Sequence, residues 1–82
     1  MDKKEVMKYV AAFLSSLNGT SGAPESTFYM ALGMDMDKWQ YVRFVLTAEP
    51  AMVRISGNYV TLTPYGRELA ERIDSVMAKA SN

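Results

Sequence analysis

The side chains with the clearest binding chemistry lie in the middle of the chain. Residues 38–63 carry Lys38, Arg43 and Arg54 but only one carboxylate, Glu49. Such cations can neutralise the phosphates of a nucleic acid or pair with the carboxylates of a protein. The rest of the chain balances them, because nine basic and nine acidic residues give a net charge of zero. The basic residues therefore act locally, and the chain as a whole does not attract nucleic acids.

Catalytic and metal chemistry have few candidate residues. The sequence contains no cysteine and no histidine, which removes disulfides, thiolate zinc sites and the usual general base. Asp35 and Asp37 stand two residues apart without the glycine-containing loop of a calcium site, and we interpret them as helix caps. We therefore expect no enzyme activity, no catalytic residues, no metal site and no cofactor.

Length and composition indicate a single globular domain over residues 1–82. The chain is 49% hydrophobic and 22% charged, as is usual for a soluble domain. No apolar run reaches the ~18 residues that a membrane span needs, and the N-terminus MDKKE lacks the apolar core of a secretory signal. We therefore expect a cytoplasmic protein without membrane contact.

The stretch SGNY at residues 56–59 predicts a β-hairpin over about 52–63. Gly-Asn between two β-rich runs suits a two-residue loop whose central residues take positive φ. Such a loop pairs Ser56 with Tyr59 and fixes the register of both strands. Arg54 and Thr61 then share one face, because side chains alternate along a strand. The opposite face is wholly apolar and holds Val53, Ile55, Val60 and Leu62.

Four helices are predicted around the hairpin. Apolar residues recur at spacings of three and four along the first and the last of them. Pro24 and the pair Thr63-Pro64 are typical of helix starts, residues 19–24 form a loop, and either Asp35 or Asp37 can cap the third helix. The predicted spans are about 2–17, 25–32, 37–48 and 64–80.

Two of these helices carry specific packing predictions. In the second helix, Phe28, Ala31 and Leu32 point inward. In the last helix, Gly66 lies on the apolar side, where glycine costs about 1 kcal/mol against alanine, so we expect another backbone to approach it closely. The apolar stripe of the last helix consists of Tyr65, Leu69, Ile73, Val76, Met77 and Ala80.

The third helix has two apolar sides. Its periodicity groups Trp39, Val42 and Leu46 on one face, which suits a core. Tyr41 and Phe44 then lie on or near the opposite side. An exposed aromatic pair is unusual for reading bases and common at protein interfaces.

The order helix, helix, tight joint, helix, hairpin, helix resembles the winged helix-turn-helix family. The matching residues are ALGMD at 31–35 in the joint, MVRI at 52–55 entering the wing and YVTLTPYGRELAERI at 59–73 leaving it. The last run is similar to the wing exit of small bacterial and archaeal transcription regulators. The resemblance implies a mostly helical α+β fold, with a three-helix core, a two-stranded hairpin as wing and a C-terminal helix.

The resemblance also implies binding to double-stranded DNA and a role in transcription regulation. The third helix enters the major groove, and the wing lies on the backbone or minor groove. Gln40, Arg43 and Thr47 are then base readers or groove contacts, and Lys38 and Arg54 contact phosphates. With the wing tip, the implied DNA-binding residues are Lys38, Gln40, Arg43, Thr47, Arg54, Asn58 and Tyr59.

Two further expectations concern protein contacts. Because few cations face the phosphates, DNA binding by this chain requires a homodimer, and the end of the last helix offers Val76, Met77 and Ala80 for dimerisation. The alternative to DNA binding is a protein-interaction module. In that hypothesis Trp39, Tyr41 and Phe44 contact a protein partner.

Overall fold

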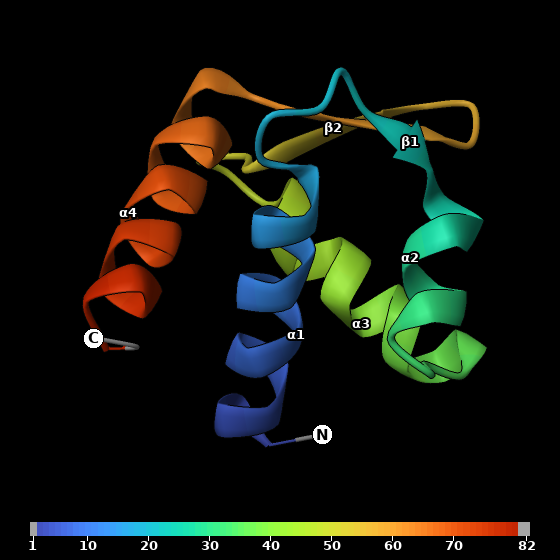
Figure 1. Ribbon diagram of the computed structural model, residues 1–82. Helices are drawn as coiled ribbons and strands as arrows, with labels where there is room; N and C mark the ends of the chain where they lie inside the picture. Colours follow the sequence, from blue (N-terminus) through green and yellow to red (C-terminus); the bar gives the residue numbers. More distant parts are fainter. Residues whose placement is uncertain (1, 81–82) are drawn as a thin grey trace.

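A computed structural model of the protein describes residues 2–80. The fold is α+β and mostly helical, with a small three-stranded antiparallel sheet across one end of the helices (Figure 1). No helix in this part of the chain is long and apolar enough to cross a membrane. The elements are α1 (Lys3–Leu17), β1 (Ala23–Pro24), α2 (Glu25–Ala31), α3 (Met36–Thr47), β2 (Val53–Ser56), β3 (Tyr59–Leu62) and α4 (Pro64–Ala80).

Helix α1 begins and ends close to its predicted positions. Asp2 is the N-cap, and its carboxylate accepts a hydrogen bond of 2.8 Å from the Glu5 amide. The predicted apolar stripe of α1 is buried at Val6, Val10, Phe13, Leu14 and Leu17. The Phe13 ring lies 4.3 Å from that of Phe28 and 5.5 Å from that of Trp39, between centroids, so α1 connects α2 and α3 through one aromatic cluster.

Helix α2 ends one residue earlier than predicted, and α3 begins one residue earlier. Phe28 is buried and Leu32 half-buried, but Ala31 is exposed, because α2 ends there and the chain turns through Leu32 and Gly33. Asp35 is the cap of α3 and accepts a hydrogen bond of 2.8 Å from the Lys38 amide. Helix α3 therefore begins at Met36, and Asp37 lies within its first turn.

The hairpin has the predicted register, in which Ser56 faces Tyr59 and Val53 faces Leu62. Val53 and Val60 are buried on its core side. The turn differs in one respect: Gly57 has a φ of +63°, but no residue other than glycine has positive φ among residues 2–80. Asn58 therefore takes an ordinary backbone conformation, and the prediction of positive φ at both central residues was wrong.

A third strand was not predicted. Ala23–Pro24 pairs with β3, opposite Val60 and Tyr59, where a loop was expected. Gly22 makes this pairing possible, since a Cβ at that position would lie 2.5 Å from the Val60 carbonyl oxygen. The strand order is β1-β3-β2, which leaves β2 at an edge of the sheet.

The start of α4 is fixed by the chain that precedes it. The Thr63 hydroxyl accepts a hydrogen bond of 3.0 Å from the Gly66 amide and donates one of 2.6 Å to the Ala51 carbonyl. The predicted close approach at Gly66 is confirmed, because a Cβ there would overlap the Met52 carbonyl group. Ala70, which was not predicted, is the fully buried residue of α4, whereas Tyr65 is 41% exposed.

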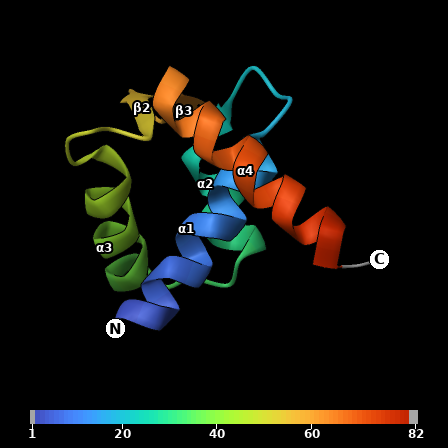
Figure 2. The ribbon, with the colours of Figure 1, turned by 90° about the vertical axis from the view of Figure 1, so that its left-hand side faces the viewer.

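Helix α4 crosses α1 and then continues past it (Figure 2). At the crossing, the Asp74 carboxylate accepts hydrogen bonds of 2.6 Å from the Ser15 hydroxyl and 2.6 Å from the Asn18 side-chain amide. These bonds hold the pKa of Asp74 below its ordinary value, because they stabilise the charged form. From Ser75 to Lys79 the residues of α4 are exposed.

Candidate functional site

Helix α3 divides its aromatic residues between two faces. Trp39, Val42 and Leu46 are all 0% exposed, as their spacing predicted. The opposite face turns Phe44 (71% exposed), Met36 (54%) and Tyr41 (51%) to solvent. The expectation that Trp39 contacts a partner was therefore wrong, since its ring is enclosed between Phe13 and Tyr29. We call Met36, Tyr41 and Phe44 the outer face of α3.

Lys38 is connected to α1. Its ammonium Nζ lies 3.1 Å from Glu5 Oε1 in an ion pair that bridges the first turns of α1 and α3. The hydrogen bond that the Lys38 ammonium donates to the Glu5 carboxylate, together with the negative charge of that carboxylate, raises the pKa of Lys38 above its usual value. The carboxylate of Glu5 therefore already offsets the charge of Lys38 before any phosphate approaches.

Arg43 is connected to the start of α2. Its Nε lies 3.7 Å from Glu25 Oε2, which is too far for a hydrogen bond. That carboxylate oxygen is buried and has no hydrogen-bond partner among residues 2–80. The Arg43 side chain is still 42% exposed, so its terminal nitrogens can reach solvent or a ligand. The pair with Glu25 thus offsets the charge of Arg43 without occupying its donors.

The other predicted groove contacts of α3 are exposed and weakly engaged. The Gln40 side-chain amide lies 3.8 Å from the Met36 sulfur, on the outer face. The Thr47 hydroxyl donates a hydrogen bond of 2.8 Å to the Arg43 carbonyl within the helix. Neither residue adds charge to this surface.

The predicted DNA-binding residues of the β2–β3 hairpin differ in how firmly they are held. Arg54 is exposed and makes no ion pair with any of residues 2–80. Tyr59 is half-exposed beside the turn. Asn58 is exposed, and its carbonyl accepts a hydrogen bond of 2.7 Å from the Glu25 amide, which ties the wing tip to the start of α2.

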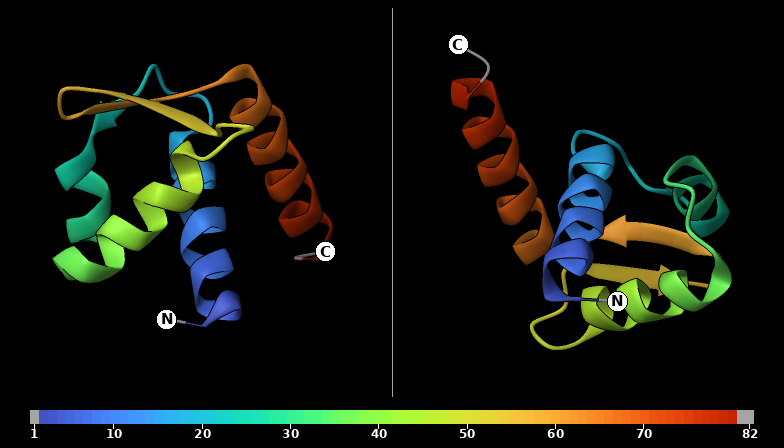
Figure 3. Two further views of the ribbon diagram at one scale, coloured as in Figure 1. Left: turned by 180° about the vertical axis from the view of Figure 1, so that it is seen from behind. Right: turned by 90° about the horizontal axis from the view of Figure 1, so that it is seen from below.

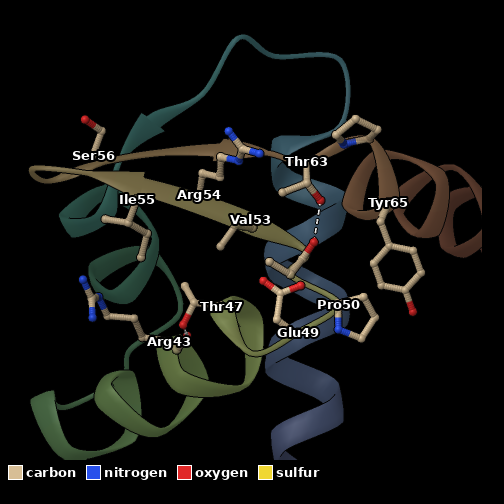
Figure 4. A pocket seen from close by; sticks show the side chains of 12 residues that line it. Arg43, Thr47, Glu49, Pro50, Val53, Arg54, Ile55, Ser56, Thr63 and Tyr65 are labelled. Carbon is tan, nitrogen blue, oxygen red and sulfur yellow. Dashed lines mark hydrogen bonds between the residues drawn. The ribbon is translucent and has the colours of Figure 1, made fainter.

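An open cleft of about 790 Å³ lies between α3 and β2 (Figure 4). Arg43 and Thr47 of α3 form one side, and Arg54 rises from β2 on the other. Glu49 lies at the end of the cleft nearer α4, next to Pro50 and Tyr65 (Figure 4). The cleft therefore brings together Arg43 and Thr47, two of the predicted base or groove contacts, and Arg54, a predicted phosphate contact. It also holds the carboxylate of Glu49, which the resemblance did not assign to the site.

The residues predicted for dimerisation lie beyond the crossing of α4 with α1. Val76 and Met77 are exposed by 64% and 60%, which leaves apolar surface available at that end. The side chain of Ala80 lies outside the described part of the chain. Within residues 2–80 the structure contains no group of three or more acidic, histidine or cysteine side chains that could hold a metal ion.

Sequence reasoning did not identify Glu5, Glu25 or Glu49 as part of these surfaces. Each belongs to a different segment, and their approach to Lys38, Arg43 and the cleft depends on the packing of α1, α2 and the chain after α3. Comparison of the chain with protein-family models, with curated proteins and with solved structures finds no match.

Proposed function

We propose that this chain is a winged helix-turn-helix domain that binds a protein partner through the outer face of α3. The fold assignment is supported by the order α1, α2, α3, hairpin, α4 and by the tight joint at which Asp35 caps α3. It is also supported by the sheet across the ends of the helices, from which β2 and β3 extend as a wing (Figure 1).

The observation that carries the function is the composition of the outer face. Phe44, Tyr41 and Met36 are each more than half exposed on a helix whose other side is fully buried. Exposed aromatic and methionine side chains in one patch are enriched at protein interfaces, where their burial supplies most of the affinity. Their helix is held by Trp39 and the core, so little ordering is needed on binding.

The ion pairs of the same surface also favour a protein partner over DNA. Lys38 and Arg43 are each paired with a carboxylate, and Arg54 is the one predicted phosphate contact without an ion pair in the described chain. Affinity for DNA scales with the number of phosphates neutralised, so one unpaired cation per subunit supports only weak binding. Tyr41 and Phe44 carry no charge, and uncharged side chains cost less free energy to bury against another protein than unpaired charges do.

The proposal is tested by partner capture from a lysate of the source organism. The wild-type domain and the double variant Tyr41→Ser, Phe44→Ser are immobilised in equal amounts, and retained proteins are identified and then titrated individually. We expect a partner bound by wild type and weakened at least tenfold by the double variant. The matched control is Lys38→Gln, which alters α3 without touching the outer face and should keep the partner.

An identified partner that binds the double variant as well as it binds wild type would contradict the proposal. So would loss of that partner on Lys38→Gln with retention by the double variant, because charge and not aromatic contact would then carry the interaction.

A second candidate function is DNA binding by a homodimer that regulates transcription. It is favoured by unpaired Arg54 and by the exposure of Lys38 and Arg43, since surface ion pairs are worth at most about 1 kcal/mol and phosphates can replace their carboxylates. Dimerisation through the exposed end of α4 would double the number of cations.

Fluorescence-anisotropy titration against a labelled duplex, from low to physiological salt, tests this candidate. A DNA-binding dimer predicts affinity that falls steeply with salt and that is reduced by Arg54→Gln. Sedimentation of the wild-type chain as a monomer at high concentration, with no duplex binding at low salt, would remove the candidate.

A further inference from the structure

The edge of the sheet formed by β2 has unpaired backbone groups. The strand order β1-β3-β2 leaves one side of β2 without a neighbouring strand. The Thr63 amide donates a hydrogen bond of 3.0 Å to the Met52 carbonyl, and the two-residue turn joins Ser56 to Tyr59. Because bonded pairs alternate in an antiparallel ladder, Arg54 and Ser56 direct their backbone groups toward β3. Val53 and Ile55 direct theirs away from β3. Val53 is only 1% exposed and therefore covered, whereas Ile55 is half-buried and reaches the open edge.

The cleft described above runs along this edge. Seen from below, α3 lies beside β2, on the side away from β3 (Figure 3). Ile55 points from β2 toward the α3 side, where Arg43 lies, whereas Arg54 points to the other side of the strand (Figure 4). Glu49, Pro50 and Tyr65 border the end of the cleft nearer α4. The cleft is thus lined along the whole of β2, from Val53 to Ser56.

The charges in the cleft select an acidic occupant. A strand placed beside β2 would alternate its side chains between the two sides of the sheet. Its residue opposite Ile55 would face Arg43, and the adjacent residue, opposite Arg54, would face the Arg54 guanidinium. Arg54 makes no ion pair with residues 2–80, and the Arg43 pair with Glu25 is through Nε, so the terminal nitrogens of both guanidinium groups stay available. Two adjacent carboxylates on the bound strand would therefore each meet an arginine. Glu49 disfavours a further acidic residue at the end of the cleft nearer α4.

We propose that this cleft binds an extended segment of a partner protein, with two adjacent acidic residues, as a fourth strand beside β2. Backbone hydrogen bonds to Ile55 hold the segment beside β2, and Arg43 and Arg54 give specificity for the acidic pair. This site goes beyond the proposed function, because it uses neither Tyr41 nor Phe44. A second copy of the chain is a poor occupant, since its own β2 edge would bring two further arginines against these two.

The probe is the fluorescein-labelled hexapeptide TVEEVT, blocked at both ends and titrated by fluorescence anisotropy. We expect binding to wild type, with an affinity lowered about tenfold by either Arg43→Gln or Arg54→Gln, because each removes a charge-assisted hydrogen bond. The matched control is Arg67→Gln, which removes an exposed arginine of α4 outside the cleft and should leave the affinity unchanged. The peptide TVKKVT should bind at least tenfold more weakly than TVEEVT.

Pairing of the peptide backbone with β2 can be tested separately from the charge contacts. N-methylation of alternate amides in TVEEVT should abolish binding in one of the two possible patterns and leave it nearly intact in the other, because only every second amide of a paired strand faces its neighbour. On binding, the Ile55 amide should gain protection from hydrogen exchange, whereas the Ser56 amide, already directed toward β3, should change little.

Several results would overturn the proposal. The first is an affinity for TVEEVT that is the same for wild type and both arginine variants. The others are equal effects of the two N-methylation patterns, no added protection of the Ile55 amide from hydrogen exchange, or displacement of the peptide when the chain associates with itself. The double variant Tyr41→Ser, Phe44→Ser should bind TVEEVT as wild type does. A negative result for peptide binding in the cleft can therefore be distinguished from a negative result for partner binding at the outer face of α3.

Discussion

Helices α3 and α4 both expose apolar side chains, but for different physical reasons. On α3, Phe44 is 71% exposed on a helix whose other face holds Trp39 at 0% exposure. On α4, Val76 is exposed because the helix extends beyond Asp74, where α4 is bonded to α1. The first surface is held rigid by a core beneath it, whereas the second belongs to a helix end with little of the domain behind it.

The difference indicates what each surface can do. A rigid aromatic patch binds a partner without losing much conformational freedom, so α3 is suited to specific recognition. A projecting helix end can be removed or covered at little expense to the fold, so α4 is suited to self-association. Substitutions that affect one helix and spare the other test this distinction.

The largest effect is expected at Trp39. Replacement by alanine should lower the free energy of unfolding by about 3–5 kcal/mol, since a large buried ring is lost from contact with Phe13 and Tyr29. Chemical denaturation measures the change. The control Phe44→Ala, on the other face of α3, should stay within about 0.5 kcal/mol of wild type. Similar losses for the two variants would mean that α3 does not have a buried and a free face.

A smaller loss is expected at the anchored start of α4. Gly66→Ala would set a methyl group against the Met52 carbonyl and should destabilise the domain by about 1–3 kcal/mol, despite the better helix propensity of alanine. Ser75→Ala, on the exposed part of the same helix, should be nearly neutral. A thermal melt in which Gly66→Ala stabilises the protein would show that the backbone approach is looser than described.

The crossing of α4 with α1 should be sensitive to acid. The pKa of Asp74 is lower in the folded chain than its ordinary value of 3.8, so the folded state binds that proton less readily than the unfolded state. The stability contributed by Asp74 is complete above pH 3.8 and disappears as the pH falls through the folded value. Denaturation curves should show this acid loss in wild type, and a smaller one in Ser15→Ala, which removes a hydrogen-bond donor to Asp74. If wild type and Ser15→Ala lost stability equally in acid, the hydrogen bond from Ser15 would not be the cause of the lowered pKa of Asp74.

The smallest effect on stability is expected at the end of α4. Val76→Ser should change the free energy of unfolding by less than about 0.5 kcal/mol, because the side chain is exposed. The same substitution should weaken any self-association, as measured by sedimentation over a range of concentrations. A Val76→Ser variant that dimerises as wild type does would move the dimer contact away from α4.

Local rules predicted much of this fold. The Gly-Asn loop fixed the hairpin register, and Thr63-Pro64 marked the start of α4, because both depend on residues adjacent in sequence. The spacing of Trp39, Val42 and Leu46 identified the buried side of α3 for the same reason. The choice between Asp35 and Asp37 as cap stayed open, since both stand at plausible positions and only the path of the joint selects Asp35.

Features that depend on the meeting of distant segments were not predictable. The strand Ala23–Pro24 is too short for any periodicity and contains a proline, so nothing in its sequence indicates pairing with β3. The ion pairs of Lys38 with Glu5 and Arg43 with Glu25 arise from the packing of α1 and α2 against α3. These pairs alter the electrostatics of the predicted site, while DNA binding and dimerisation stay predictions.

The most direct test of the division of α3 into two faces is iodide quenching of the single tryptophan, Trp39. Because iodide is charged and does not enter a packed core, the account predicts a blue-shifted emission and a quenching constant several-fold lower in the native protein than in urea. Phe44→Trp should add a second, red-shifted component that iodide quenches readily. Native Trp39 emission quenched as strongly as in the unfolded chain would contradict the account, because neither the core nor the outer face of α3 would then exist as described.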